Sequence, residues 1–290
     1  MNSDFAVLVL GSVQDGGYPH IGCKKACCQH AWKDTSKRRL VCSLAIIDKS
    51  LNECWIIDAS PDIKHQINMV SDFLKIESVP KIKGIFLTHA HTGHYSGLLD
   101  LGKEALNASE ISLYSMPQMS DFIKSNSAFQ FLINSKNISL KLIENGQSIY
   151  LSGSVSIAPF LVPHRNEMSE TVGYCIKSQN KSVIYLPDID SWEIWDKDIV
   201  SLVRDNDYLF IDGTFYSENE ILDRNIDEIP HPFIINTLGN LSILNKKERS
   251  KVFFTHLNHT NPVIQDSSTV KQKLISDGYR IAEEAQSFQI

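Results

Sequence analysis

Several short runs of β-branched and aromatic residues in this 290-residue chain lead directly into an aspartate or a histidine. Runs of this composition, bounded by turn residues, predict β-strands. Buried strands of α/β proteins carry their functional residues on the loops after their carboxyl ends, so the pattern predicts an α/β fold with one polar edge. The runs are residues 54–58 ending at Asp58, 84–88 before His89, 181–186 before Asp188, 208–212 ending at Asp212, and 251–255 before His256.

The rest of the chain divides into further strands and a few helices, which indicates two β-rich halves with helices covering both. Ser60 and Pro61 predict a helix start, because serine is a favoured N-cap and proline suits the first helical position. The other predicted strands are residues 6–10, 44–48, 111–115, 154–159 and 171–177. The predicted helices are residues 61–74, 96–106, 117–126, 217–223 and 262–277.

The composition is that of a soluble globular protein, with 42% hydrophobic and 21% charged residues and a net charge of −6. A general nucleic-acid binder is more often basic, so a nucleic-acid partner is not expected. The apolar residues 5–11 have no preceding lysine or arginine, so they predict a first strand and not a signal peptide. No apolar run is long enough to span a bilayer. We therefore expect a cytoplasmic protein without a membrane partner.

Three histidines, His89, His91 and His94, lie within six residues in the stretch THAHTGHYSGL. In an extended segment His89 and His91 would point to opposite faces, so a shared ligand requires a loop. The preceding strand-like run places that loop at a buried strand end. Because neutral imidazole is a favoured ligand of zinc and other first-row metals, the stretch predicts a metal site.

The sequence THAHTGH at residues 88–94 resembles the HxHxDH motif of the metallo-β-lactamase superfamily, with Gly93 where that family usually has aspartate. An isolated His164, the strand-end Asp188 and the late His256 follow in the order that the superfamily shows. The resemblance implies a four-layer αβ/βα sandwich, formed as one domain over residues 1–290.

A closer resemblance covers nearly the whole chain and concerns the pyrroloquinoline-quinone biosynthesis protein B branch. The chain is also similar to the phosphodiesterase of the carbon–phosphorus lyase pathway and, more distantly, to tRNase Z enzymes. The segments that carry the resemblance are residues 11–12, 16–19, 58–62, 212–215 and 256–262.

The resemblance implies a role for each ligand candidate. His89, His91 and His164 would bind a first metal. His94 and His256 would bind a second, and Asp188 would bridge the two and take part in catalysis. A catalytic zinc would lower the pKa of a bound water and polarise the scissile bond, with iron or manganese as alternatives to zinc.

Gly93 removes one carboxylate ligand from the second metal. We therefore expect weaker binding there, and we expect Gly93→Asp to raise the metal content. The alternative is that the small residue makes room for a substrate group.

Three thiols lie close together at Cys23, Cys27 and Cys28. Thiolates favour a closed tetrahedral zinc, which is a structural site. The fourth ligand could be the nearby His30, whereas the resemblance to the phosphodiesterase implies the distant His259. The remaining cysteines lie in apolar runs and are expected to be small buried residues: Cys42, Cys54 and Cys175.

Other polar residues have both a functional and an ordinary interpretation. Asp58 could orient a ligand histidine or simply end a strand, and Asp212 and Thr214 could support the site or satisfy backbone groups. Arg165 could contact an anionic substrate or remain solvated. His231 resembles a substrate-side catalytic histidine of the phosphodiesterase relatives, and the alternative is a loop histidine.

The sequence thus favours a metal-dependent hydrolase that uses a metal-bound water, acting on a phosphodiester or similar small anionic ester. One alternative is an iron-dependent enzyme that oxidatively tailors a tyrosine-derived precursor in cofactor biosynthesis. Another is a non-catalytic binding protein on the same scaffold. The expected partner is a small-molecule substrate, and a homodimer is left open.

Overall fold

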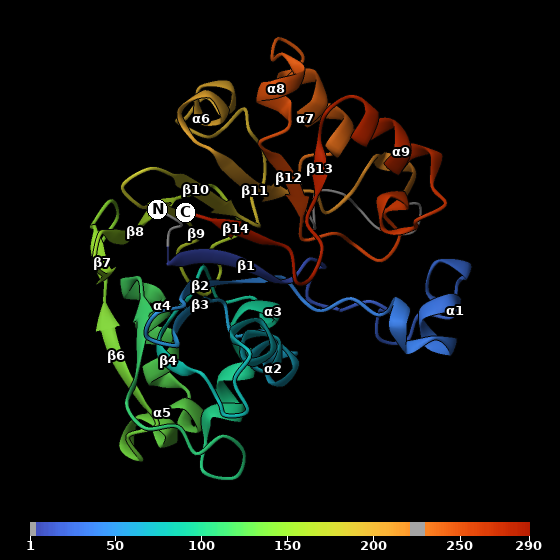
Figure 1. The fold of residues 1–290 in the computed structure, drawn as a ribbon. Coiled ribbons are helices and arrows are strands. Elements are labelled where there is room, and N and C mark those ends of the chain that lie inside the picture. Colours follow the sequence, from blue (N-terminus) through green and yellow to red (C-terminus); the bar gives the residue numbers. More distant parts are fainter. Residues whose placement is uncertain (1–3, 221–229) are drawn as a thin grey trace.

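A computed structural model describes residues 4–220 and 230–290, which form two seven-stranded sheets packed face to face (Figure 1). The first sheet has the order β14-β1-β2-β3-β4-β5-β6, and the second has the order β13-β12-β11-β10-β9-β8-β7. The first sheet contains β1 (Phe5–Gly11), β2 (Ser43–Asp48), β3 (Glu53–Ile57), β4 (Lys81–Phe86), β5 (Ile111–Ser115), β6 (Ile138–Leu142) and β14 (Ser287–Gln289). The second contains β7 (Ile149–Ser152), β8 (Val155–Leu161), β9 (Val172–Lys177), β10 (Ser182–Leu186), β11 (Tyr208–Asp212), β12 (Val252–Thr255) and β13 (Arg280–Ile281).

The two sheets share one plan, in which antiparallel strands lead into parallel ones. In the first sheet β1 to β3 are antiparallel neighbours, and β3 to β6 run parallel. In the second sheet β7 to β10 are antiparallel neighbours, and β10 to β13 run parallel. Parallel strands end at the same edge, so β3 and β4 deliver their following loops together, as do β10, β11 and β12.

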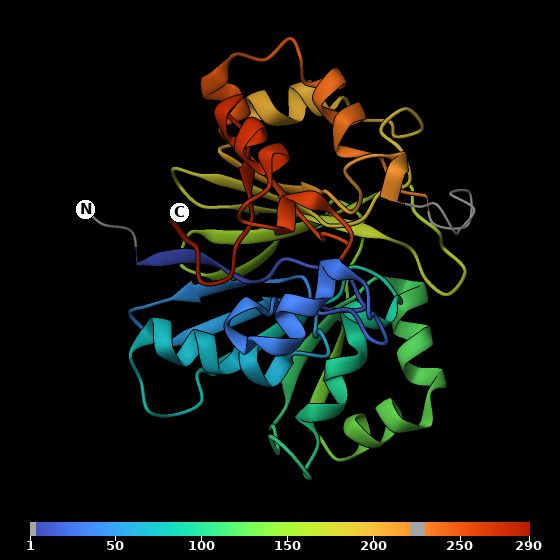
Figure 2. The same ribbon diagram turned by 90° about the vertical axis from the view of Figure 1, so that its right-hand side faces the viewer.

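Helices cover the outer face of each sheet, so the molecule has four layers (Figure 2). The helices α6 to α9 lie over the second sheet, and α2, α4 and α5 lie under the first (Figures 1 and 2). The α-helices are α1 (Ala26–Lys33), α2 (Ile63–Leu74), α3 (Thr92–Tyr95), α4 (Pro117–Ser125), α5 (Ser127–Asn134), α6 (Ile199–Asp205), α7 (Ile234–Asn240), α8 (Lys246–Arg249) and α9 (Thr269–Ser276). Short 3₁₀ turns are η1 (Thr35–Lys37), η2 (Ser96–Leu101), η3 (Glu218–Glu220) and η5 (Pro262–Ile264).

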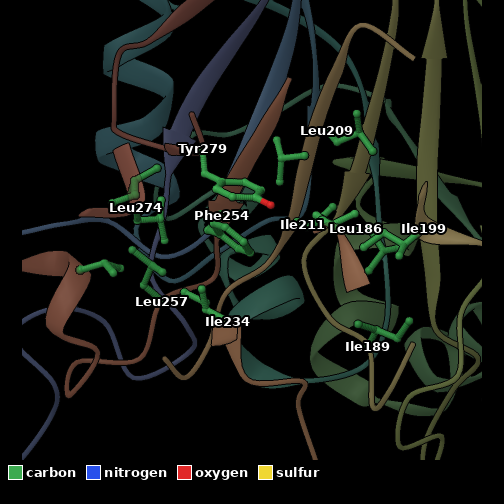
Figure 3. Close-up of a cluster of buried hydrophobic side chains, with 14 of the residues drawn as sticks. Leu186, Ile189, Ile199, Leu209, Ile211, Ile234, Phe254, Leu257, Leu274 and Tyr279 are labelled. Atoms are coloured by element: carbon green, nitrogen blue, oxygen red, sulfur yellow. The ribbon is translucent and has the colours of Figure 1, made fainter. Parts of the chain in front are cut away.

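Three hydrophobic clusters separate these layers. Along β1, Val7 and Val9 pack between the two sheets, while Leu8 and Leu10 face the helices of the first sheet. Strands buried on both faces read as nearly continuous apolar runs, which explains the composition of this strand. The third cluster lies between the second sheet and its helices, where Ile211, Phe254 and their neighbours meet (Figure 3). The predicted four-layer sandwich is therefore confirmed.

The predicted helices were only partly correct. The helix predicted at 117–126 is α4, and that at 61–74 begins later, at Ile63, after a turn in which the Asp62 amide donates to Ser60 Oγ. The helix predicted at 96–106 is only the turn η2, which ends at Leu101 where Gly102 adopts an extended conformation.

Two other predicted helices also differ. Residues 262–277 divide into η5 and α9, with Ser268 capping the second piece by accepting from the Lys271 amide. Of the helix predicted at 217–223, only the short turn η3 falls among the described residues, and positions 221–223 lie outside them. Within the described ranges no helix combines the length and apolarity needed to cross a membrane.

Candidate metal centre

The loops after β3, β4, β10, β11 and β12 meet at one edge of the sandwich, as the sequence pattern predicted. Asp58 and His256 follow their strands directly and adopt positive φ angles of 68° and 57°. A non-glycine residue in this left-handed region is costly, and such residues cluster at functional sites. The sharp turns end the strands at the site edge.

A first group at this edge contains His89, His91, His164 and Asp188. Nδ1 of His91 lies 2.8 Å from Nε2 of His89 and 3.3 Å from Nε2 of His164. Nε2 of His164 in turn lies 3.6 Å from Oδ1 of Asp188. One ligand atom from each of these residues lies within 4.8 Å of the others, a separation small enough for a single ion.

A second group lies on the other side of Asp188. The Oδ2 atom of Asp188 is 3.3 Å from Nε2 of His94 and 3.5 Å from Nε2 of His256. These three atoms are buried, and none finds a hydrogen-bond partner among the described residues. Buried polar atoms without partners are costly, so their convergence fits a site for a cation.

Each ligand candidate histidine in the two groups is held through its second ring nitrogen, with one exception. Nδ1 of His94 lies 2.7 Å from Asp58, and Nδ1 of His164 lies 2.8 Å from Asp190. The hydroxyl of Thr88 is 2.9 Å from Nδ1 of His89 and that of Thr214 is 2.9 Å from Nδ1 of His256. Such contacts fix the ring and its tautomer in metal sites. The exception is His91, whose Nδ1 faces the first group and whose Nε2, in the described part of the chain, has only the exposed Glu167 carboxylate nearby, at 3.8 Å.

The pKa shifts in the first group favour the protonation states that bind a cation. Burial lowers the pKa of His91 to about 4 and holds the pKa of His89 well below its usual range, with neighbouring imidazoles adding to the effect. Burial opposes the charge of Asp188, but the imidazoles around it outweigh burial and lower its pKa. Neutral imidazoles and an ionised carboxylate are the forms that bind a metal.

His231 belongs to this site and is not an ordinary loop residue. Its Nδ1 lies 2.6 Å from Oδ2 of Asp212, and its ring stands between those of His164 and His256, with centroids 5.4 and 5.8 Å away. Burial disfavours the imidazolium, but the carboxylate of Asp212 outweighs burial and raises the pKa of His231. Asp212 also accepts from the Thr214 backbone and hydroxyl, so it both supports the site and satisfies the backbone.

The cysteine group assembles beside the centre. Sγ of Cys27 and Sγ of Cys28 lie 3.5 and 3.4 Å from Nδ1 of His259, and Sγ of Cys23 lies 3.8 Å from that of Cys27. His30 points elsewhere on the exposed surface of α1, so of the two candidates it is His259 that joins the thiols. Three thiols and one imidazole at these distances match a Cys₃His zinc site. Burial raises the pKa of Cys28 to about 12, so a cation is needed to hold its thiolate.

The other cysteines behave mostly as expected. Cys42 and Cys54 are fully buried, whereas Cys175 on β9 is only half-buried.

A cavity of about 460 Å³ opens onto both groups of metal-ligand candidates. The residues that line it include His91, Asp188, His231 and His256 from the centre and the cations Lys24, Lys25 and Arg165. Its size suits a small molecule, and its lining carries both cations and the carboxylates of Asp15, Asp188 and Glu220.

Two residues of the site escaped prediction from the sequence. Asp190 holds His164, and Asp15 places Oδ1 3.4 Å from Nε2 of His94 and 3.6 Å from Nε2 of His256. Asp15 follows β1 as the other site residues follow their strands, but three residues separate it from the strand end. Because of this separation, the sequence does not mark Asp15 as a strand-end residue.

Comparisons with known proteins agree with this geometry. Residues 55–257 match the family model described as the beta-lactamase superfamily domain. The chain is 24% identical to Coenzyme PQQ synthesis protein B of Methylorubrum extorquens, over 96% of this chain and 97% of that protein.

Two solved structures share the fold. The zinc-bound PqqB from Methylobacterium extorquens has a TM-score of 0.80 at 22% identity, covering 98% of this chain and 100% of that one. A diphosphatase from the PhnP family has a TM-score of 0.69 at 22% identity, covering 99% of this chain and 97% of that one.

Proposed function

Since the chain belongs to the metallo-β-lactamase superfamily, we propose that it is a metal-dependent hydrolase of a phosphodiester or similar small anionic ester. The observation that carries this proposal is the position of Asp188 between two imidazole groups. One of its oxygens is 3.6 Å from His164, and the other is 3.3 Å from His94. A carboxylate placed in this way suits a site for two neighbouring cations, with Zn²⁺ as the first candidate.

Bound divalent metals supply a water of lowered pKa and polarise the scissile bond. The protein's own contribution is to position the substrate and to move a proton. Because Nδ1 of His231 faces Asp212, its Nε2 is the atom left to act on a substrate in the cavity. The raised pKa of His231 favours the imidazolium, which can donate its proton to the departing ester oxygen.

The preference for an anionic ester rests on the cations of the cavity. Arg165, Lys24 and Lys25 line the same 460 Å³ space as Asp188 and His231. The carboxylates of Asp15, Asp188 and Glu220 also line this cavity, so the three cations favour an anion once bound metal ions offset those carboxylates. The similarity to a PhnP-family diphosphatase supports a phosphoryl substrate as well.

The test is hydrolysis of phosphodiesters with good and poor leaving groups by the metal-loaded protein. We expect turnover that a chelator abolishes and Zn²⁺ or Mn²⁺ restores. His231→Gln should lower kcat by about 10²-fold or more with a poor leaving group, and by less with nitrophenolate, which needs no proton. The control His65→Gln changes an exposed histidine of α2 and should leave turnover unchanged. Failure to hydrolyse any phosphodiester, carboxylic ester or lactone would contradict the proposal.

A second candidate function follows from the similarity to Coenzyme PQQ synthesis protein B over 96% of the chain. In that case the centre would hold iron, which imidazole ligands also suit, and would oxidise a tyrosine-derived precursor of a quinone cofactor. Iron in the protein as isolated, together with substrate-dependent O₂ consumption, would favour this function over hydrolysis.

A further inference from the structure

Gly93, which occupies the usual aspartate position of the HxHxDH motif, lies directly against another carboxylate. A Cβ atom added to Gly93 would lie 2.4 Å from Oδ1 of Asp15 and 2.7 Å from its Cγ. It would also lie 2.8 Å from the Asp15 Cα, so moving the Asp15 side chain alone would not relieve the overlap. Glycine is therefore required at position 93 as long as Asp15 stands where it does.

The Asp15 carboxylate faces the second group of ligand atoms. Its Oδ1 is 3.4 Å from Nε2 of His94 and 3.6 Å from Nε2 of His256. Oδ2 of Asp188 makes the corresponding approaches at 3.3 and 3.5 Å. Ligand atoms bound about 2.0–2.1 Å from a tetrahedral zinc lie about 3.3–3.4 Å apart. The ligand atoms of Asp15, His94 and His256 thus lie within 4.8 Å of one another, close enough to hold a single cation, and Asp188 approaches the same two nitrogens.

The loop that carries Asp15 is fixed to the loop that carries His256. The Leu257 amide donates to the Ser12 carbonyl at 2.9 Å, and the Gln14 amide donates to the Leu257 carbonyl at 3.1 Å. The side chain of Gln14 also donates to Asn258 at 3.1 Å. These bonds join the residues just before Asp15 to the residues just after His256 and hold the two side chains in a fixed relation, as a preorganised ligand pair requires.

We propose that Asp15 is a ligand of the second metal, and that it replaces the carboxylate that the motif lacks at Gly93. The carboxylate comes from position 15 of the sequence, but it lies in the space that a side chain at position 93 would enter. This inference rests on the proposed metal centre, but it does not depend on which substrate the centre acts on. It also changes the expectation drawn from the motif, because Gly93→Asp alone would drive two carboxylates into one space and lower metal binding.

The test is the metal content and metal affinity of the purified full chain, measured by elemental analysis and by competition with a chromogenic chelator. Asp15→Ala should lose about one metal equivalent per chain, with an affinity at the second group weakened by about 100-fold or more. Asp121→Ala removes an exposed aspartate of α4 and should lose none. An unchanged metal content and affinity in Asp15→Ala would overturn the inference, as would a wild-type centre that binds only one equivalent.

A double-mutant cycle separates a ligand from a merely structural residue. Gly93→Ala should weaken the second metal in the wild-type background, because its Cβ displaces Asp15. In an Asp15→Gly background the same change should cost less metal affinity, because the carboxylate that it displaces is already absent and only the 2.8 Å contact with the Cα of residue 15 remains. Equal losses from Gly93→Ala in both backgrounds would contradict the inference. Metal content is independent of turnover, so a chain that binds the metal but hydrolyses nothing refutes the proposed function alone.

Discussion

The Cys/His group takes three of its four side chains from residues 23–28, whereas the His/Asp centre collects its side chains from loops of both sheets. The two groups meet in one short segment, where His256 faces the centre and His259 faces the thiols. Helix α1 stands at the edge of the sandwich and covers neither sheet (Figure 1). The difference indicates that the Cys/His group stabilises the peripheral segment around residues 23–28, whereas the two packed sheets position the His/Asp centre.

The largest expected effect comes from replacing Asp188, which lies between the first and second groups of the His/Asp centre. Asp188→Ala should eliminate metal from the His/Asp centre and lower kcat by more than about 10³-fold, because both groups lose a ligand. The Cys/His zinc should remain, so elemental analysis should still find one equivalent per chain. Asp196→Ala, an exposed aspartate farther along the same loop, is the control. Loss of all bound metal would show that the two groups are not independent.

The converse change removes the Cys/His zinc and spares the centre. Cys28→Ser should lose one zinc equivalent and lower Tm by roughly 5–10 °C, because a bound metal stabilises the folded chain. Cys175→Ser changes a half-buried thiol of β9 and should keep its zinc. Retention of the full zinc content in Cys28→Ser, seen by elemental analysis, would rule out this group as a zinc site.

A milder change tests the contacts that orient the centre. Asp58 lies 2.7 Å from Nδ1 of His94 and accepts from the Thr88 amide at 2.8 Å. Asp58→Asn keeps the shape but weakens the hold on His94, and it should cost about 10–100-fold in affinity for the second metal. Chelator competition measures this effect, and the Cys/His group should show no change. Equal affinity in the variant would make Asp58 a strand-end residue only.

The smallest expected effect is a difference in how metal affinity depends on pH between the Cys/His group and the first group of the His/Asp centre. Without metal, the pKa of Cys28 is about 12, so zinc binding there must release a proton, and protons compete with zinc throughout the neutral range. Each proton released weakens apparent affinity by about tenfold for each unit that the pH falls. The pKa of His91 is about 4, so protons compete little at the first group above pH 5. Titration from pH 8 to pH 5.5 with a chelator should therefore weaken zinc binding at the Cys/His group more steeply than metal binding at the first group, and an equal or shallower loss at the Cys/His group would contradict this picture. The second group is not part of this comparison, because burial lowers the pKa of His94 but the carboxylates of Asp58, Asp15 and Asp188 outweigh burial and raise it.

Much of the centre was visible in the sequence because each ligand candidate follows a recognisable strand. His89, Asp188 and His256 come directly after apolar runs, and the strands place them at one edge. The structure brings together all of the ligand candidates chosen from the resemblance, and their role as metal ligands stays a proposal. Other predictions stay untested: that residues 1–290 form one domain, that the partner is a small molecule and not a nucleic acid, that the chain can form a homodimer, and that the protein is cytoplasmic.

The helices were harder to predict than the strands, for a physical reason. Strand patterns repeat every two residues, and burial on both faces makes them strongly apolar. The helices here are short, and their ends depend on local backbone changes that apolar periodicity does not reveal, as where Gly102 adopts an extended conformation and ends η2 after six residues. The strands β6, β7, β13 and β14 were also missed. β13 and β14 have only two and three residues, and most residues of β6 and β7 are half-buried or exposed, although the sequence ISLKL of β6 alternates apolar and polar residues.

The sequence by itself indicated an α/β fold and the ligand candidates, because strand composition and ligand type are properties of neighbouring residues, and its resemblance to a known superfamily added the four-layer sandwich. Only the tertiary structure chose His259 over His30, since that choice depends on which imidazole reaches the thiols. The tertiary structure also shows that the carboxylate absent at Gly93 has a counterpart in Asp15. Asp15 and Gly93 are far apart in the chain, and only the packing of their loops reveals that one fills the space the other leaves.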